Sequence, residues 1–508
     1  MIWKLAKKDL LLNLMTFKFA VGTIVCVLLT VALMPALVHD YQQRWQEYRA
    51  GVTADEEELR AAKVYDNVTS GRRVYRPPPV LSVFSRGVES QVSNSASISN
   101  HSMPEIGAGW AAVNPYLAIL RTLDLSLLYQ MVLSLLALLV ACDAISGERV
   151  TGTLMLIASG TVARHEVLLA KVVAGVLTLV VPLTMAFLSA ILVLSLSSVA
   201  DLAAADWVRM GLLYLVTLLF LLAVYNGGLL ISCLTGYPVT SLMLGLFFWV
   251  ILALIIPNAG GYLATQFRPL EPAEPTKAKI SALDDEYFFK AAGAGDKIPL
   301  RGRGVEHEEK AFRRYTLVCD EEWIDSLIKR NLAREPFRRE YVDRSRELEH
   351  QYVETLFRQE RLATSLSRIS PVCMYENVMS ALAGTDTAGC RSFVAAARAH
   401  RQEVLEYVRA KTDNLQAPLL FTPCTPADRQ QYQQYLDKKM SEEEFQQWKD
   451  RRIAQLRPLD LQDYPRFVYR GDILRDLRAS LLDVSALVFA NALFFALAFV
   501  VFLKYDVR

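Results

Sequence analysis

The chain has 508 residues, of which 53% are hydrophobic and 21% are charged, and its formal net charge at pH 7 is +2. The charged residues avoid six long apolar runs and are concentrated between them. Each run approaches the ~20 residues that a helix needs to cross the ~30 Å apolar core of a bilayer. This distribution excludes a soluble enzyme and predicts an all-α membrane protein with six spans and two extramembrane insertions. The net charge of +2 says little about partners, and we expect no nucleic-acid partner.

The N-terminal segment, residues 1–18, is predicted to form a helix on the membrane surface. It carries Lys4, Lys7 and Lys8, and an apolar run over 19–38 follows it. A cleavable signal peptide has a shorter apolar region of about 7 to 15 residues. We therefore expect 19–38 to be a retained first span. The lysines can set topology or attract anionic lipid.

The first insertion is predicted over 39–124. A charged stretch around 55–63 has helical character, and three consecutive prolines follow at 77–79. Residues 91–102 are rich in Ser and Asn, a composition that favours a loop.

Five further apolar runs predict the remaining spans, at 125–142, 172–196, 210–234, 239–256 and 484–503. The segment between the second and third spans, 143–171, is short, mixed in polarity and punctuated by glycines. In an interfacial helix the apolar residues of this segment would rest on the membrane, namely Ile145, Val150, Leu154 and Ile157. Its polar residues would face water, namely Glu148, Arg149, Thr151 and Thr153. Such a helix is a suitable lever, because a partner that pushes on it moves two spans together. An ordinary surface loop is the alternative.

The second insertion, 262–482, is large enough to be a domain of its own. Three prolines, Pro269, Pro272 and Pro275, predict a stiff linker at its start. Periodic apolar residues predict helices over 323–367 and around 393–408, and a capping-box pattern at Ser441 and Glu444 predicts a third that ends near Pro458. We expect a mainly helical domain with an antiparallel hairpin that projects from the membrane.

Four cysteines lie in the second insertion: Cys319, Cys373, Cys390 and Cys424. In an oxidising compartment they could form two disulfides by three connectivities, between which the sequence does not choose. Four free thiols are the alternative.

The basic residues predict the orientation of the spans. Lysines precede the first span, Arg149, Arg164 and Lys171 lie between the second and third, and Lys504 follows the sixth. The loop between the third and fourth spans instead carries Asp201. Because positive residues on short loops remain in the cytoplasm, both termini are expected there and both insertions outside.

Motifs of catalysis are missing from the sequence. A phosphate-binding loop requires a Gly-Lys pair, and the chain contains none. The pairs His165-Glu166 and His307-Glu308 lack the second histidine of a zinc-protease motif, and no Cys/His spacing indicates a metal site. No Asp, Glu, Lys or Arg interrupts a span, which argues against a proton path. We expect no catalytic residue, metal or cofactor in this chain.

The run Asp143-Ala-Ile-Ser-Gly-Glu-Arg-Val-Thr-Gly-Thr-Leu154, followed by a basic segment and Ala170-Lys171, resembles the coupling-helix signature of ABC-2 exporter permeases. The resemblance is greatest to the branch that includes multicopper-enzyme-maturation permeases. The segments 76–87, Arg-Pro-Pro-Pro-Val-Leu-Ser-Val-Phe-Ser-Arg-Gly, and 368–393 also resemble that branch. The match extends over most of the chain.

This resemblance implies a permease of the bacterial inner membrane, driven by a separate ATPase subunit that binds ATP and Mg. The coupling residues, Glu148, Arg149, Thr151, Gly152 and Thr153, would enter a cleft on the ATPase, and the helix with Lys4, Lys7 and Lys8 would also touch it. A second copy or a related permease would complete the complex.

The large second insertion departs from the simple family fold and leaves two functions open. One is an exporter that moves a substrate. The other is a mechanotransmitter, in which the outer helical domain regulates or recruits a periplasmic or envelope protein.

Overall fold

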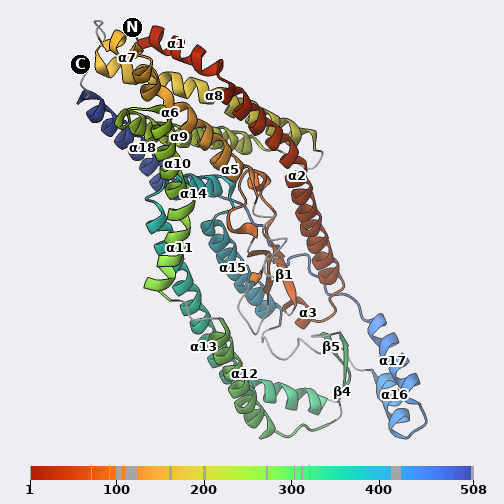
Figure 1. Cartoon of the computed structure of the whole chain (residues 1–508). Coiled ribbons are helices and arrows are strands. Elements are labelled where there is room, and N and C mark those ends of the chain that lie inside the picture. Colours follow the sequence, from red (N-terminus) through yellow and green to blue (C-terminus); the bar gives the residue numbers. More distant parts are fainter. Residues whose placement is uncertain are drawn as a thin grey trace.

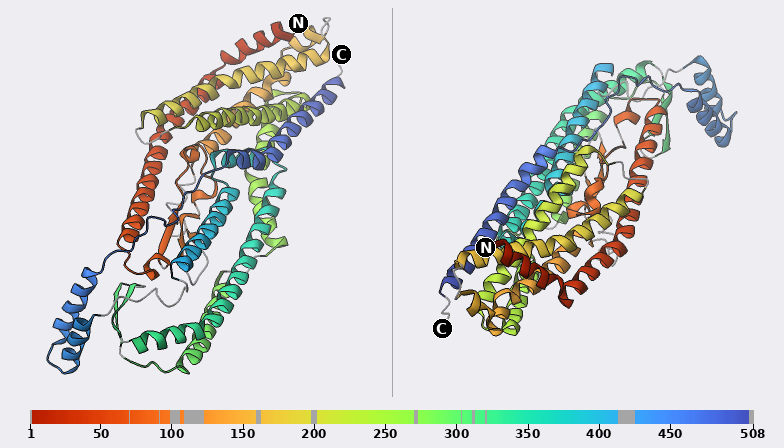
Figure 2. Two further views of the ribbon diagram at one scale, coloured as in Figure 1. Left: turned by 180° about the vertical axis from the view of Figure 1, so that it is seen from behind. Right: turned by 90° about the horizontal axis from the view of Figure 1, so that it is seen from above.

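A computed structural model describes residues 2–69, 71–90, 92–98, 106–108, 123–158, 163–197, 202–269, 273–302, 304–310, 313–319, 321–412 and 425–504. Both ends of the chain lie at the same end of an elongated molecule (Figure 1). We call this the terminal end of the spans. The opposite end, from which both insertions extend, is called the insertion end (Figure 2).

The structure has six helical stretches, among the described residues, that are long and apolar enough to cross a membrane. Each contains one of the predicted spans. They are α2 (Phe17–Arg60), α5 to α6 (Leu125–Val150), α8 (Arg164–Leu196), α9 (Ala204–Leu234), α10 to α11 (Pro238–Phe267) and most of α18 (Ile473–Leu503). The expected all-α membrane fold is confirmed.

Two spans are interrupted by a turn of π-helix. The turn η4 (Tyr129–Leu133) lies between α5 (Leu125–Leu128) and α6 (Ser134–Val150), and η5 (Ile251–Ile255) lies between α10 (Pro238–Val250) and α11 (Ile256–Phe267). Such turns alter the backbone hydrogen bonding and frequently mark functional positions. Here the hydroxyl of Ser370 donates to the carbonyl of Leu252 at 2.6 Å, so η5 receives a side chain from the second insertion.

Close contacts and polar side chains join the spans to one another. The Asn226 amide on α9 donates to Asn491 Oδ1 on α18 at 3.1 Å, as expected for mid-span asparagines that bond neighbouring helices. A Cβ added to Gly175 on α8 would lie 2.3 Å from the ring of Tyr225 on α9. The spans therefore pack too closely for a side chain at this crossing.

The first insertion begins as a direct continuation of the first span. α2 has 44 residues, about 66 Å of helix, and it includes most of the charged stretch at 55–63. A short helix α3 (Asp66–Thr69) and an antiparallel sheet of β1 (Arg72–Tyr75), β2 (Val92–Ile98) and β3 (Ile106–Ala108) follow. The predicted loop at 91–102 is therefore wrong in part. Ala96 and Ile98 are buried, and the alternation of residues in β2 fits a sheet with one buried face.

The second insertion is mainly helical, as predicted. Its helices are α12 (Ala273–Asp296), α13 (Glu321–Ser367), α14 (Pro371–Ala383), α15 (Thr387–Thr412), α16 (Pro426–Leu436) and α17 (Glu442–Gln455), with a β-hairpin of β4 (Gly304–Lys310) and β5 (Arg313–Cys319). The predicted capping box of Ser441 and Glu444 is present at the start of α17. Figure 1 shows α12 and α13 side by side as a projecting pair. The predicted proline linker is partly wrong, since Pro275 lies in the first turn of α12.

Parts of both insertions fold back onto the spans and share their apolar core. The turn η1 (Val80–Val83) places Phe84 with its ring centroid 5.1 Å from that of Phe187 on α8. Helix α14 stacks Tyr375 on Phe220 of α9 at 4.5 Å. The insertions are therefore packed against the membrane domain and are not separate domains on linkers.

A buried histidine makes the stability of the second insertion dependent on pH. His400 on α15 is 6% exposed, and its ring centroid lies 5.3 Å from that of Phe467. Burial lowers the pKa of His400 below its ordinary value of 6.5, against the opposing effect of Glu403. The unfolded chain therefore binds a proton before the folded chain does. The contribution of neutral His400 to the free energy of unfolding is therefore full above pH 6.5. It is lost as the pH falls from 6.5 towards the lower pKa of His400 in the folded chain.

We expect a His400→Gln variant to lose part of this acid sensitivity. Its thermal midpoint should fall less than that of the unmodified chain between about pH 7.5 and about pH 5.5. His39 is exposed, so His39→Gln is the matched control and should behave like the unmodified chain. Equal acid sensitivity in the His400 variant would contradict the assignment.

Candidate functional site

The second span continues beyond the membrane run into the predicted coupling segment. α6 extends without a break to Val150, Gly152 adopts a φ of +74° in the turn that follows, and the short helix α7 (Thr153–Ala158) comes next. The chain resumes with α8 at Arg164. The interfacial helix expected from the sequence is therefore corrected to a prolonged span, a turn and a short helix.

The prolongation of α6 is held by polar contacts with α9. Ser232 Oγ accepts from the backbone nitrogens of Ile145 and Ser146 at 3.1 and 3.0 Å. Arg149 Nη1 donates to the carbonyl of Thr235 at 2.8 Å. These bonds hold the last turns of α6 against the end of α9.

A buried ion network lies beside this segment and joins three helices. Lys171 Nζ on α8 is 2.7 Å from Glu148 Oε1 on α6 and 3.0 Å from Asp9 Oδ2 on α1 (Ile2–Leu14). The three side chains are 7%, 13% and 11% exposed, respectively. Lys8 Nζ lies 3.9 Å from the same Glu148 oxygen. We call Lys8, Asp9, Glu148 and Lys171 the terminal-end network.

The network corrects the predicted exposure of two coupling residues. Glu148 and Arg149 were expected to face water, but Glu148 is committed to Lys171, and Arg149 binds a carbonyl of its own chain. The sequence could not indicate the burial of Glu148, because Asp9 and Lys171 are remote from it along the chain. Val150, expected to rest on the membrane, is 57% exposed within the chain, and its contact with the membrane stays a prediction.

Other predicted residues form an exposed surface next to the network. Thr151 is exposed, Met155 is 50% exposed, and Gly152 and Thr153 are half-buried. On α1, Lys4, Lys7 and Lys8 are all exposed. We call Val150, Thr151, Met155 and these three lysines the terminal-end face; Figures 1 and 2 show α1 and α7 at this same end.

Helix α1 lies along α8. Its Ala6 is buried against Ala170 and Ala174, while Trp3 is 65% exposed. The Asn13 amide donates to Thr178 Oγ1 at 3.3 Å. The predicted surface helix is therefore bound to the third span along much of its length.

Two of the four cysteines considered for disulfides are free thiols. Cys373 is buried on α14, and Cys390 is half-buried on α15. The side chain of Cys319 and the whole of Cys424 lie outside the described residues. Among the residues that the structure describes, no group of three His, Cys, Asp or Glu side chains could hold a metal ion.

The two further segments that resemble the family meet at the insertion end. Val88 N donates to Thr385 O at 3.0 Å, and Thr385 Oγ1 donates to Ser85 O at 3.0 Å. The Arg76 guanidinium donates to the carbonyl of Gly384. This junction between the two insertions was not predicted, because only the fold brings the segments together.

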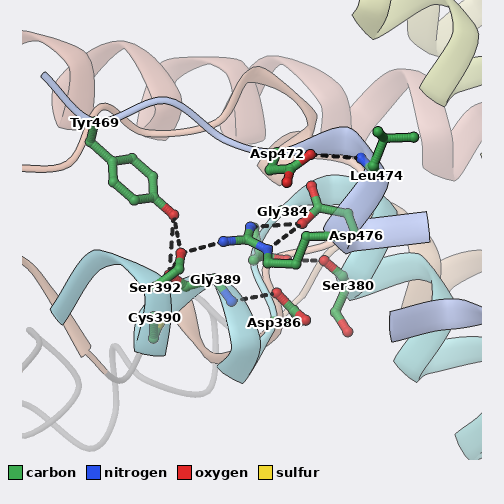
Figure 3. Close-up of polar contacts among 12 residues, drawn as sticks. Ser380, Gly384, Asp386, Gly389, Cys390, Ser392, Tyr469, Asp472, Leu474 and Asp476 are labelled. Atoms are coloured by element: carbon green, nitrogen blue, oxygen red, sulfur yellow. Dashed lines mark hydrogen bonds and ion pairs between the residues drawn. The ribbon is translucent and has the colours of Figure 1, made fainter. Parts of the chain in front are cut away.

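Acidic residues on α18 anchor the junction to the spans. The Asp476 carboxylate forms two ion pairs. Its Oδ2 lies 2.8 Å from Arg209 Nη2 of α9, and its Oδ1 lies 2.7 Å from Nη2 of the neighbouring Arg475. Figure 3 shows this carboxylate in one polar cluster with Ser392 and Tyr469, whose hydroxyl oxygens are 2.6 Å apart.

Two turns after Asp476 on α18, Asp483 accepts two hydrogen bonds from the Arg368 guanidinium, of 2.7 and 3.1 Å. Arg368 directly follows α13, so the projecting pair is tied to the sixth span. The predicted bounds place residue 476 within the second insertion, 262–482, and residue 483 beside the sixth span, 484–503. The two aspartates are seven residues apart, which places them two turns apart on one face of α18. This spacing could have indicated a helix face that receives arginines from other segments.

Comparison with known proteins agrees with this architecture. The family described as ABC-2 family transporter protein matches residues 3–507. No curated protein matches the chain. The family match covers nearly every residue, including all six spans and both insertions. The chain therefore belongs to the ABC-2 transporter family, and it is a membrane-spanning permease subunit of an ABC transporter.

Proposed function

We propose that this chain is the permease of an ATP-driven exporter of the bacterial inner membrane, driven by a separate ATPase that docks on the terminal-end face. The observation that carries the proposal is the terminal-end network. It joins α1, α6 and α8 directly behind an exposed turn. A force applied to Val150, Thr151 and Met155 would therefore be transmitted to three helices at once.

The ATPase would supply the nucleotide chemistry. ATP and Mg would bind to that subunit, since this chain has no Gly-Lys pair for a phosphate-binding loop. The three lysines of α1 would add positive charge to the docking surface. This chain would pair with a second copy of itself or with a related permease, and each permease would bind one ATPase. Closure of the two ATPases would then tilt the second and third spans.

The basic residues support the orientation. Lys4, Lys7 and Lys8 lie on α1, Arg164 begins α8, and Lys504 directly follows α18. Arg164 also donates to the carbonyl of Leu503, and Figure 1 shows α1 and the end of α18 together at the terminal end. Under the positive-inside rule this end is cytoplasmic and the insertions are periplasmic.

Affinity purification of the full chain from its native membrane, with mass spectrometry of the bound proteins, tests the docking surface. An ATPase should co-purify with the unmodified chain. We expect a Val150→Asp/Met155→Asp variant to lose it, because two charges are placed on a half-apolar contact surface without disturbing a buried residue. Leu332→Asp/Leu436→Asp is a matched control, since these side chains are 47% and 46% exposed on the insertions. Retention of the ATPase by the first variant would contradict the site.

Mechanotransmission is the second candidate, and the continuity of the helices favours it. α2 extends from the first span far into the first insertion, and Arg368–Asp483 ties α13 to the sixth span. Tilting of the spans would therefore move the projecting pair. The purification distinguishes the two functions, because a mechanotransmitter should also retain a periplasmic or envelope protein through the insertions.

A further inference from the structure

A cavity at the insertion end is lined by an unusual number of arginines. Its volume is about 370 Å³, and Arg49, Arg76, Arg209 and Arg475 line it together with Trp45 and Tyr469. These residues come from α2, from the chain after β1, from the start of α9 and from the segment that leads into α18. The cavity thus lies where three spans leave their apolar runs.

The positive charge of the cavity is only partly neutralised within the chain. Its lining holds four guanidiniums and two carboxylates, Asp206 and Asp476. Asp476 alone serves both Arg209 and Arg475. Asp206 accepts from the backbone of Ala203 at the start of α9.

Arg76 carries the charge that most needs a partner. It is 4% exposed, yet among the described residues no carboxylate forms an ion pair with it. Its guanidinium donates to the Gly384 carbonyl, lies 3.6 Å from Cys390 Sγ and stacks 5.6 Å from the centroid of Tyr469. Asp386 acts on Arg76 only at longer range, without an ion pair. A buried cation with no anion in contact is costly, and an anion beside it offsets that cost.

The location and chemistry of the cavity favour a phosphate at the membrane surface. Tryptophan and tyrosine concentrate at the level of lipid headgroups. Trp45 lines the cavity. Trp207, two residues before Arg209 on α9, is 50% exposed. Guanidinium groups match the oxygens of a phosphate in two-bond geometry. Next on α9, Val208 and Leu215 are 62% and 57% exposed, which provides an apolar surface for acyl chains.

We propose that this cavity binds a phosphate group, that of a phospholipid headgroup in the leaflet at the insertion end. The bound phosphate lies among Arg49, Arg76 and Arg209 and compensates the buried charge of Arg76. It thereby bridges α2, the segment after β1 and α9. The proposal is independent of the ATPase and of what the complex transports.

The test uses the full chain in nanodiscs that contain phosphatidylglycerol with a photoreactive headgroup. After illumination, crosslinked peptides should include residues of the cavity, in α2 near Trp45 or at the start of α9. Arg49→Gln/Arg209→Gln should reduce this crosslinking about tenfold, because two charge-assisted contacts are lost. Arg60→Gln/Arg358→Gln removes the same charge from side chains that are 75% and 58% exposed elsewhere, and it should crosslink like the unmodified chain.

Two further probes identify the source of the phosphate. A photoreactive diacylglycerol, which lacks phosphate, should not label the cavity, and excess inorganic phosphate should compete with the phospholipid. If inorganic phosphate binds in calorimetry with the same dependence on Arg49 and Arg209 while the lipid does not label, the phosphate comes from solution. Equal labelling of the cavity by diacylglycerol, or unchanged labelling in Arg49→Gln/Arg209→Gln with a native thermal midpoint, would overturn the proposal.

Discussion

Replacement of Lys171 by Met is expected to lower the free energy of unfolding by about 3–5 kcal/mol, the usual effect of removing one partner from a buried ion pair. The substitution leaves Asp9 and Glu148 facing each other without a cation between them. Both carboxylates are nearly as buried as the lysine that separates them. The cation that remains is Lys8, which is 48% exposed and lies 3.9 Å from Glu148. Two buried acids with so little compensation are more costly than the lost contacts alone. Thermal or denaturant unfolding of the purified chain in detergent measures the effect.

Two controls separate the network from a general effect of losing a lysine. Lys18 pairs with Asp143 at the same end of the molecule, but their side chains are 51% and 42% exposed. Lys18→Met should therefore cost no more than about 1 kcal/mol. Asp9→Asn/Glu148→Gln/Lys171→Met, which removes every central charge, should recover much of the lost stability. If Lys171→Met and Lys18→Met had equal effects, the network would not hold the three helices together.

A Gly87→Ala substitution should disrupt the junction between the two insertions at a cost of roughly 2–4 kcal/mol. Gly87 has a φ of +46°, where an L side chain is strained. A Cβ at this position would also lie 2.6 Å from the Thr385 carbonyl oxygen and 3.0 Å from Ser380 Cβ. The backbone carbonyl cannot rotate away as a flexible side chain would, so the two insertions must separate.

Gly71 supplies a matched control for this prediction. Its φ of +73° is also left-handed, but no atom lies within 4 Å of the position that a Cβ would take. Gly71→Ala should therefore cost only the backbone strain, about 1–2 kcal/mol. Hydrogen exchange across α14 and α15 should increase in the Gly87 variant and remain unchanged in the Gly71 variant. Identical exchange in the two variants would show that the contact with Thr385 is unimportant.

The sequence predicts the six spans correctly because burial in a bilayer excludes charge from long continuous runs, a property of each segment by itself. It also predicts the cap of α17 at Ser441 with Glu444 and the end of that helix near Pro458, since these depend on neighbouring residues. The loop predicted at 91–102 failed because Ser and Asn dominate the composition there. The buried alternation that includes Ala96 and Ile98 was the better indication.

The candidate site could be predicted only in part. The motif that begins at Asp143 indicated the region proposed here for docking, and that role stays a prediction. The exposure of Thr151 agrees with the expectation. The burial of Glu148 depends on Lys171 and Asp9, and such pairing is a property of the folded chain. The same holds for Asp476 and Asp483, whose arginines lie in distant segments. Charged residues that the sequence alone would place on the surface are therefore buried in ion pairs with residues remote along the chain.

The most direct test of the proposed coupling site is a crosslink from Thr151 to the ATPase. A photoreactive amino acid at this exposed position in the turn, within the full chain in its native membrane, should form an adduct with a protein that contains a phosphate-binding loop. The same amino acid at Thr355, an exposed position on α13, should form none with that protein. An adduct from Thr151 alone is the result that we predict. An ATPase that crosslinks equally from both positions, or from neither, would contradict docking on the terminal-end face.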